Sequence, residues 1–200
     1  MLKLNLIGGE PCAGKSTIVK YIKNCKEINI EFKYKKIVRG YYSKDNTYCI
    51  IGVYEGGIFG GTDRLSMSVQ PVLIEWVKEN KNKYKNVYLE GDRVFKSSFI
   101  DACRQILGDI NIIIIKTTEE NKKERHKKRG DEQSEKWLKS KKTSVYNIET
   151  KYKTIIFNNN SPVDKYDIGN RLLSKSVFDN YNEPIQKNLF DINPEDAAKF

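Results

Sequence analysis

The pattern of apolar and polar positions is clearest at the start of the chain. Residues 3–7, KLNLI, form a mostly apolar run that is typical of a short strand. A polar, glycine-bearing stretch follows at residues 8–17. Apolar side chains then recur at positions i, i+3, i+4 and i+7, as one face of a helix requires: Ile18, Tyr21, Ile22 and Cys25. The pattern therefore predicts a strand, a loop and a helix in that order.

The rest of the chain alternates between predicted strands and predicted helices. Strands are expected at residues 31–38, 48–54, 86–89, 110–115 and 153–157. Helices are expected at residues 69–76, 99–106 and 163–175. The polar cluster at residues 43–46 predicts a hairpin between the first two of these strands. The alternation predicts an α/β fold with a mostly parallel central sheet and helices on both faces.

Two further helices, expected at residues 118–129 and 131–142, are unusually polar. Asp131 is expected to cap the second of them, whose large apolar residues are Trp137 and Leu138. Helices this polar are poorly anchored to a core. They form either a solvated bulge or a mobile lid that carries cations over bound phosphates, and we favour the lid.

The loop after the first strand carries a phosphate-binding motif. Residues 9–16, GEPCAGKS, match G-x-x-x-x-G-K-S in the required context of strand, loop and helix. Loop N–H groups and the helix N-terminus offer partial positive charge to a polyphosphate, Lys15 reaches the β- and γ-phosphates, and the Ser16 hydroxyl binds Mg²⁺. The motif predicts binding of ATP and Mg²⁺ by Gly9, Ala13, Gly14, Lys15, Ser16 and Thr17.

A second chemical feature follows the strand expected at residues 86–89. Glu90 comes directly after this strand, and Asp92 and Arg93 follow it. A phosphate-loop enzyme needs a carboxylate at the carboxyl end of a second buried strand to hold Mg²⁺, directly or through water. We therefore expect Glu90 to share the metal with Ser16.

A glycine-rich segment at residues 56–61 precedes Asp63 and Arg64. It is either a flexible surface turn or the wall of a substrate pocket, because glycines allow a close approach of the backbone. Loops on a rigid sheet commonly carry function, so we favour a pocket that contains Asp63 and Arg64.

Composition adds a possible partner and a compartment. The formal net charge is +10, which invites a polyanion such as nucleic acid, although a coding bias toward Lys and Asn would produce it as well. The four cysteines have no metal-ligand spacing, and neither a signal peptide nor an apolar run of membrane-spanning length is visible. These features predict a cytoplasmic protein that does not contact a membrane.

One domain is expected at residues 1–175, with its lid at about 118–142. Residues 176–200 are expected to form an irregular tail that wraps the body or is disordered.

The order of these features resembles the nucleoside-monophosphate-kinase-like branch of P-loop kinases over residues 2–175. Residues 90–93, EGDR, are similar to the Asp-Gly-x-x-Arg that often ends the second buried strand in that family, with Glu in place of Asp and a shorter spacing to the Arg. The resemblance implies a three-layer P-loop kinase fold with a helical lid. It also implies that Arg125 and Arg129 of the lid contact the transferring phosphoryl group, and that the polar loop starting at Asn158 lies against adenine.

Within that branch, residues 61–66, GTDRLS, together with EGDR look like small bacteriophage kinases. Some of these phosphorylate the hydroxymethyl group of 5-hydroxymethyluracil already in DNA. The resemblance therefore implies that the acceptor is a hydroxyl on modified DNA.

Acceptor chemistry separates the remaining hypotheses. A neutral hydroxyl requires a general base, for which Asp63 is the first choice and Asp92 the second. A phosphate acceptor requires no base and would be bound bidentately by Arg64 and Arg93. A single Asp-Arg pair in place of an Arg cluster favours the hydroxyl. The alternative hypothesis is a kinase of free nucleosides or nucleoside monophosphates, and a third hypothesis is a nucleotide-binding switch. The sequence does not predict the oligomeric state.

Overall fold

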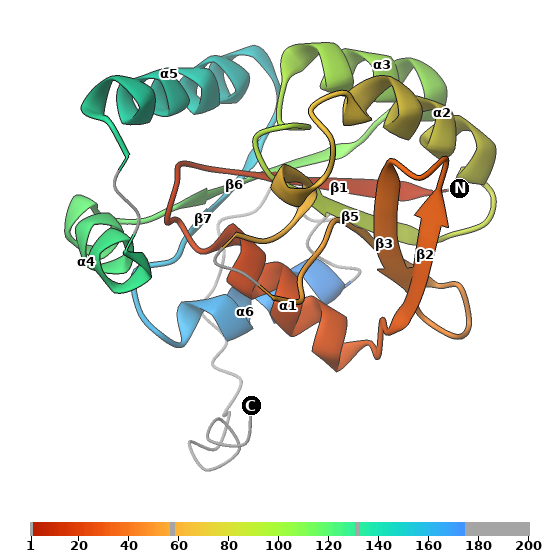
Figure 1. The fold of residues 1–200 in the computed structure, drawn as a ribbon, viewed down its shortest axis with the longest axis horizontal. Coiled ribbons are helices and arrows are strands. Elements are labelled where there is room, and N and C mark those ends of the chain that lie inside the picture. The colour runs from red at the N-terminus through yellow and green to blue at the C-terminus, as the bar shows by residue number, and fades with distance from the viewer. Residues whose placement is uncertain (1, 57–58, 131–132, 175–200) are drawn as a thin grey trace.

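Seven strands form one sheet at the centre of the molecule, in the order β2-β3-β4-β5-β1-β6-β7 (Figure 1). Their bounds are Lys3–Gly8 (β1), Ile30–Tyr34 (β2), Val38–Tyr42 (β3), Tyr48–Ile51 (β4), Asn86–Glu90 (β5), Asn111–Lys116 (β6) and Ile155–Asn158 (β7). From β4 to β7 neighbouring strands are parallel, whereas β2, β3 and β4 pair antiparallel. This computed structural model describes residues 2–56, 59–130 and 133–174.

Helices cover both faces of the sheet, which confirms the predicted three-layer α/β fold (Figure 1). One face carries α1 (Lys15–Cys25) and α6 (Asp164–Leu173), and the other carries α2 (Val69–Asn80), α3 (Ser97–Leu107) and α5 (Glu135–Lys151). Helix α4 (Glu119–Arg129) follows β6 at one end of the molecule, and a short 3₁₀ helix, η1 (Thr62–Arg64), precedes α2. In the part of the chain that the structure describes, no helix is both long and apolar enough to cross a membrane.

Alternate residues of the central strands contribute to two apolar cores. In β6, Ile112 and Ile114 pack into the core shared with α2 and α3, whereas Ile113 and Ile115 pack into the core shared with α1 and α6. All four side chains are buried. A parallel strand covered on both faces needs apolar residues at consecutive positions, so the continuous apolar run that predicted this strand is explained.

The prediction was wrong at the antiparallel edge. A single strand was expected at residues 31–38, but β2 ends at Tyr34 and a further strand, β3, begins at Val38. Lys35 and Lys36 make the turn between them with left-handed φ values of 48° and 59°. Neither is a residue that commonly signals such a turn, so the pattern did not indicate it. The hairpin turn predicted at residues 43–46 is present, and it joins β3 to β4.

Helix α5 is longer than predicted and starts later. Its cap is Ser134, whose hydroxyl accepts a hydrogen bond from the Trp137 N–H at 3.3 Å; Asp131, the expected cap, lies outside the described residues. The helix was expected to end at residue 142 but continues to Lys151, because its second half buries Ile148 in the core. The predicted tail at residues 176–200 also lies outside the described residues.

Helices α1 and α6 meet through a glycine. A Cβ atom at Gly169 would lie 2.3 Å from the Tyr21 ring, and the Tyr21 hydroxyl donates to Asn170 Oδ1 at 2.8 Å. The close approach of the ring therefore requires the absence of a side chain at position 169.

We expect Gly169→Ala to destabilise the protein by about 1–3 kcal/mol through overpacking, although alanine is the better helix former. In a Tyr21→Ala background the same substitution should instead stabilise by about 1 kcal/mol, because only the helix propensity is left. Urea unfolding of the four proteins of this cycle measures both effects. A stabilising Gly169→Ala in the otherwise unchanged chain would contradict the packing argument.

Candidate active site

The phosphate loop links β1 to α1 and depends on two glycines with positive φ. Gly9 has φ 140°, and a Cβ there would lie 2.3 Å from the carbonyl oxygen of Ile115. Gly14 has φ 94° and stands at the start of α1 without a side-chain cap. The first amides of α1 are therefore left for another acceptor, as in an anion site at a helix N-terminus.

Lys15 lies over this loop. Its Nζ atom donates to the carbonyl oxygens of Gly9 at 2.8 Å and of Glu10 at 2.9 Å. The ammonium group is thus held above the loop amides, where it adds a full charge to their partial charges. This arrangement suits the β- and γ-phosphates of a nucleotide.

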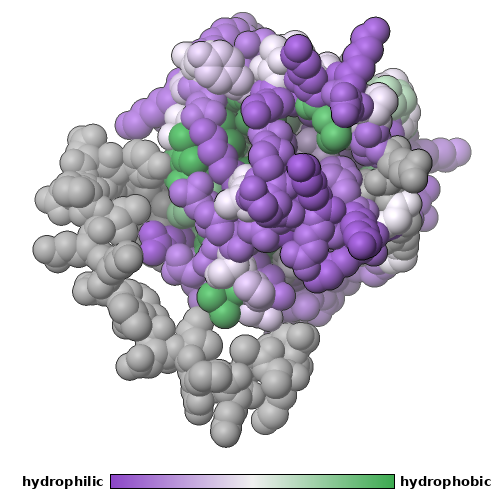
Figure 2. Space-filling view, turned by 90° about the vertical axis from the view of Figure 1, so that its left-hand side faces the viewer, coloured by the Kyte–Doolittle hydropathy of each residue, from purple (hydrophilic) through white to green (hydrophobic). Residues whose placement is uncertain are grey.

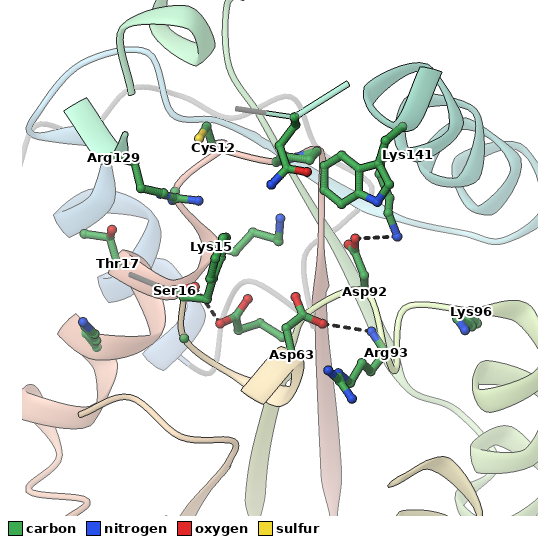
Figure 3. A pocket seen from close by; sticks show the side chains of 18 of the residues that line it. Cys12, Lys15, Ser16, Thr17, Asp63, Asp92, Arg93, Lys96, Arg129 and Lys141 are labelled. Atoms are coloured by element: carbon green, nitrogen blue, oxygen red, sulfur yellow. Dashed lines mark hydrogen bonds and ion pairs between the residues drawn. The ribbon is translucent and has the colours of Figure 1, made fainter. Parts of the chain in front are cut away.

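Ser16 and Glu90 form the oxygen pair that was expected to hold Mg²⁺. The Ser16 hydroxyl donates to Glu90 Oε1 at 2.7 Å (Figure 3), and Glu90 is 1% exposed. Burial raises the pKa of Glu90 to about 7, opposed by the charge of Lys15 and the hydrogen bond from Ser16. Mg²⁺ is usually held by one or two protein oxygens together with substrate phosphates and water, and this pair fits that pattern. Among the described residues, no group of three or more His, Cys, Asp or Glu side chains could hold a metal ion.

The glycine-rich segment packs against this pair. A Cβ at Gly61 would lie 2.1 Å from Glu90 Oε1, so only glycine fits there. The Thr62 hydroxyl donates to the backbone oxygen of Glu90 at 2.8 Å, which fixes η1 on the end of β5. These two contacts place the next residue, Asp63, beside the phosphate loop.

The Asp63 carboxylate points into the same space as Lys15 and Asp92 (Figure 3). Its Oδ1 atom accepts a hydrogen bond from the Arg93 N–H at 3.1 Å. Burial raises the pKa of Asp63, and the negative charge of Asp92 raises it further. A carboxylate of increased basicity is therefore held in a fixed orientation at the side of the cavity.

Arg64, the neighbour of Asp63, points elsewhere. Its Nη1 atom donates to the backbone oxygens of Glu55 and Gly56, and Arg64 does not line the cavity. The structure thus separates the Asp63-Arg64 pair: the acid faces the cavity, and the arginine supports the glycine-rich segment.

The two lid arginines are also separated. Arg129 lines the cavity, and its guanidinium carbon lies 5.7 Å from the centroid of the Phe59 ring. Arg125 donates to the backbone oxygens of Cys12 at 3.1 Å and of Asn159 at 3.0 Å, behind the loop. A spacing of four residues put both on one helical face, but each side chain contacts a different part of the site.

Asn159, which the sequence analysis did not single out, is the asparagine that contacts the loop. It is buried, and its amide donates to the Ala13 backbone oxygen at 2.7 Å. Asn158, which the family resemblance places against adenine, is exposed at the end of β7. The sequence has three consecutive asparagines at residues 158–160. Which of them is buried depends on the residue at which the strand ends, and a polar run does not reveal that residue.

A buried lysine also joins α4 to the loop. Lys122 in α4 pairs with Glu10 at 2.8 Å and with Glu119 at 2.6 Å. A buried ammonium group needs such partners, because desolvation disfavours its charge. The sequence signal for this pair was weak, because Lys122 is one of many lysines in a charged run.

These elements enclose a cavity of about 470 Å³. Its predicted lining residues are Gly14, Lys15, Ser16, Thr17, Asp63, Glu90, Asp92, Arg93 and Arg129. Its further cationic and apolar lining, which sequence reasoning missed, includes Lys20, Lys96, Lys141, Phe59, Met67 and Trp137. Among the residues that the structure describes, six cations and three carboxylates thus share one space with three exposed apolar side chains. Such a cavity can bind a polyphosphate at one end and a second, partly apolar molecule at the other.

Comparisons with known proteins agree with this geometry. The model of the family described as P-loop Nucleotide Kinase3 matches residues 2–167. An unliganded sugar kinase from Janibacter sp. HTCC2649 has a similar structure (TM-score 0.50, 16% identity), with 86% of this chain and 93% of that chain covered. A gluconokinase from Sinorhizobium meliloti 1021 is also similar (TM-score 0.51, 12% identity), with 90% and 98% covered. No curated protein matches the sequence significantly. At these identities the two structures support the fold alone, whereas the family match covers most of the chain. The chain therefore belongs to the P-loop nucleotide kinase 3 family, and it is a kinase.

Proposed function

We propose that this kinase transfers the γ-phosphoryl group of ATP to a hydroxyl, and that its acceptor is the hydroxymethyl group of 5-hydroxymethyluracil in DNA. The observation that carries the hydroxyl acceptor is Asp63, an oriented carboxylate of raised pKa that faces the same cavity as Lys15. A hydroxyl must lose its proton as it attacks phosphorus, and such a carboxylate is suited to accept it.

In the proposed reaction, Lys15 and the amides of α1 hold the β- and γ-phosphates. Ser16 and Glu90 would hold Mg²⁺, which neutralises phosphate charge when bound. The acceptor oxygen forms a bond to the γ-phosphorus, its proton goes to Asp63, and ADP leaves with the electrons of the broken P–O bond. Arg129 stabilises the charge on the transferring group from the lid side.

The direction of Arg64 favours a hydroxyl over a phosphate acceptor. Bidentate binding of an acceptor phosphate was expected to use Arg64 together with Arg93. Because the Arg64 guanidinium is held by two backbone oxygens outside the cavity, Arg93 would have to act without it. The cavity therefore suits a neutral acceptor better than a phosphate acceptor.

Charge and apolar surface support a nucleic-acid acceptor. Helix α4 carries six Lys or Arg and three Glu, and α5 carries five Lys and two Glu. The side of the molecule on which α4 lies is predominantly hydrophilic (Figure 2). Phe59, Met67 and Trp137 in the cavity offer the flat or polarizable surface on which a nucleobase stacks. A free nucleoside or nucleoside monophosphate would use the same surface and is the second candidate, favoured by the description of the family.

An acceptor screen with labelled ATP tests the proposal. The acceptors are duplex DNA with and without 5-hydroxymethyluracil, nucleosides, nucleoside monophosphates and gluconate. Label should enter the modified duplex, and incorporation should fall steeply with salt, since each neutralised phosphate contributes about −0.9 to the log–log slope. Efficient labelling of a free nucleotide, with none in modified DNA, would falsify the DNA acceptor.

Lys15→Ala should lower phosphoryl transfer at least about a hundredfold, because the preorganised positive charge at the transferring group is lost. The exposed Lys78→Ala on α2 is the matched control and should retain full activity. Steady-state kinetics measures the loss, and circular dichroism checks the fold. Near-normal turnover in Lys15→Ala would exclude the assigned role.

Arg129→Ala and Arg125→Ala should have different kinetic effects. Arg129→Ala should lower kcat about tenfold or more, because this arginine faces the transferring group. Arg125→Ala should mainly raise the KM for ATP about tenfold, since it supports the phosphate loop through the Cys12 oxygen. Lys128→Ala, exposed on the same helix, is the control. Identical profiles for the two arginine variants would contradict the separation seen in the structure.

Asp63→Asn should reduce transfer to a hydroxyl acceptor by roughly 10²–10⁴ through loss of the base. The dissociation constant for ATP, measured by calorimetry, should be unchanged, because the contacts of the phosphate loop do not include this side chain. Full activity of Asp63→Asn would remove Asp63 as the base and, with it, the main argument for a hydroxyl acceptor.

A further inference from the structure

Asp92 is the second carboxylate at the acceptor side, and its contacts differ from those of Asp63. Its Oδ2 atom lies 2.7 Å from Lys141 Nζ (Figure 3), and the two side chains are 30% and 27% exposed. Lys141 belongs to α5, and both side chains line the cavity. An ion pair at the side of the cavity therefore joins the turn after β5 to α5.

The half of α5 that reaches this ion pair has little other attachment. None of residues 135–142, all of which the structure describes, is buried, whereas Ile148 further along the helix lies in the core. Within this half, Lys141 lies 5.2 Å from the centroid of the Trp137 ring, and both side chains line the cavity. Fixing Lys141 consequently fixes one wall of the cavity.

Asp92 also lies in the turn that orients the base. It follows Gly91, whose φ is 122°, and it precedes Arg93, whose N–H donates to Asp63 at 3.1 Å. A Cβ at Gly91 would lie 2.9 Å from the Asp63 carboxylate, so the turn and the base are in close contact. If α5 moved and displaced Asp92, the backbone that orients Asp63 would therefore move as well.

We propose that Asp92 is a positioning residue rather than the general base, and that its ion pair with Lys141 holds the first half of α5 over the acceptor. This inference rests on the proposed function, in which Asp63 takes the proton. The pairing explains the division of labour between the two carboxylates: the Asp92 carboxylate is paired with Lys141 at 2.7 Å, whereas the Asp63 carboxylate is oriented by a backbone N–H and points into the cavity.

The test is a double-mutant cycle with Asp92→Asn and Lys141→Met. Each single variant should lower transfer about two- to fivefold, as expected for a partly exposed ion pair, and the double variant should be no worse than either. Lys141→Arg, which keeps the charge, should restore activity. Lys142→Met is the matched control, because this exposed neighbour pairs within the lid, 3.7 Å from Glu119, and should not change activity.

Hydrogen exchange of the amides at residues 135–142 supplies a readout that needs no acceptor. Exchange should be faster by about two- to fivefold in both single variants and no faster in the double, and it should be unchanged in Lys142→Met. A loss of 10²–10⁴ in Asp92→Asn with unchanged exchange would make Asp92 the base and overturn the proposal. Additive effects in the cycle would overturn it as well. If no hydroxyl acceptor is found, the exchange data still decide whether the ion pair holds α5, so the two failures are distinguishable.

Discussion

The uncapped N-terminus of α1 is the feature on which the rest of the site depends. Gly14 leaves the first amides of this helix without a side-chain partner, and the parallel sheet directs them to the edge where β1, β5 and β6 end. A concentration of unsatisfied donors beside an ammonium group is stable only next to water or an anion. The surrounding elements are accordingly arranged to admit a polyphosphate, and the carboxylate of Glu90 accepts a hydrogen bond from Ser16 at the start of this helix.

Two interactions from α4 stabilise the outer side of the same loop. Arg125 donates to the backbone oxygen of Cys12, and Lys122 pairs with Glu10. Because both cations belong to α4, a displacement of this helix would also change the conformation of the loop. Helix α4 is thus joined to the phosphate loop, and its charged residues divide between supporting the loop and lining the cavity.

The sequence predicted what is local and periodic. Strand, loop and helix around the phosphate motif, the apolar strand β6 and the pairing of Ser16 with Glu90 all follow from short-range patterns or from the fact that parallel strands end at one edge. It did not predict β3, because two lysines make the turn that precedes it.

The sequence also did not predict the direction in which several side chains of the site point. Arg64 and Asp63 are adjacent in the chain, yet a 3₁₀ turn points them to different places. Asn159, in the middle of a run of three asparagines, donates to the phosphate loop, and Lys141 approaches Asp92 because α5 continues to its anchor at Ile148. Such contacts depend on tertiary packing, which no window of sequence contains.

The contact between Gly61 and Glu90 has a consequence for how this kinase can change its acceptor over evolution. The backbone of the glycine-rich segment is so close to the carboxylate that no side chain can be added at Gly61, and at Gly60 a Cβ would lie 3.2 Å from Ser16. Gly61 is therefore closed to variation, and a side chain at Gly60 would require Ser16 to shift slightly. Changes of acceptor that arise around this segment therefore have to come from the outward residues on either side of it, Phe59, Asp63 and Met67, which line the cavity without entering the contact between Ser16 and Glu90.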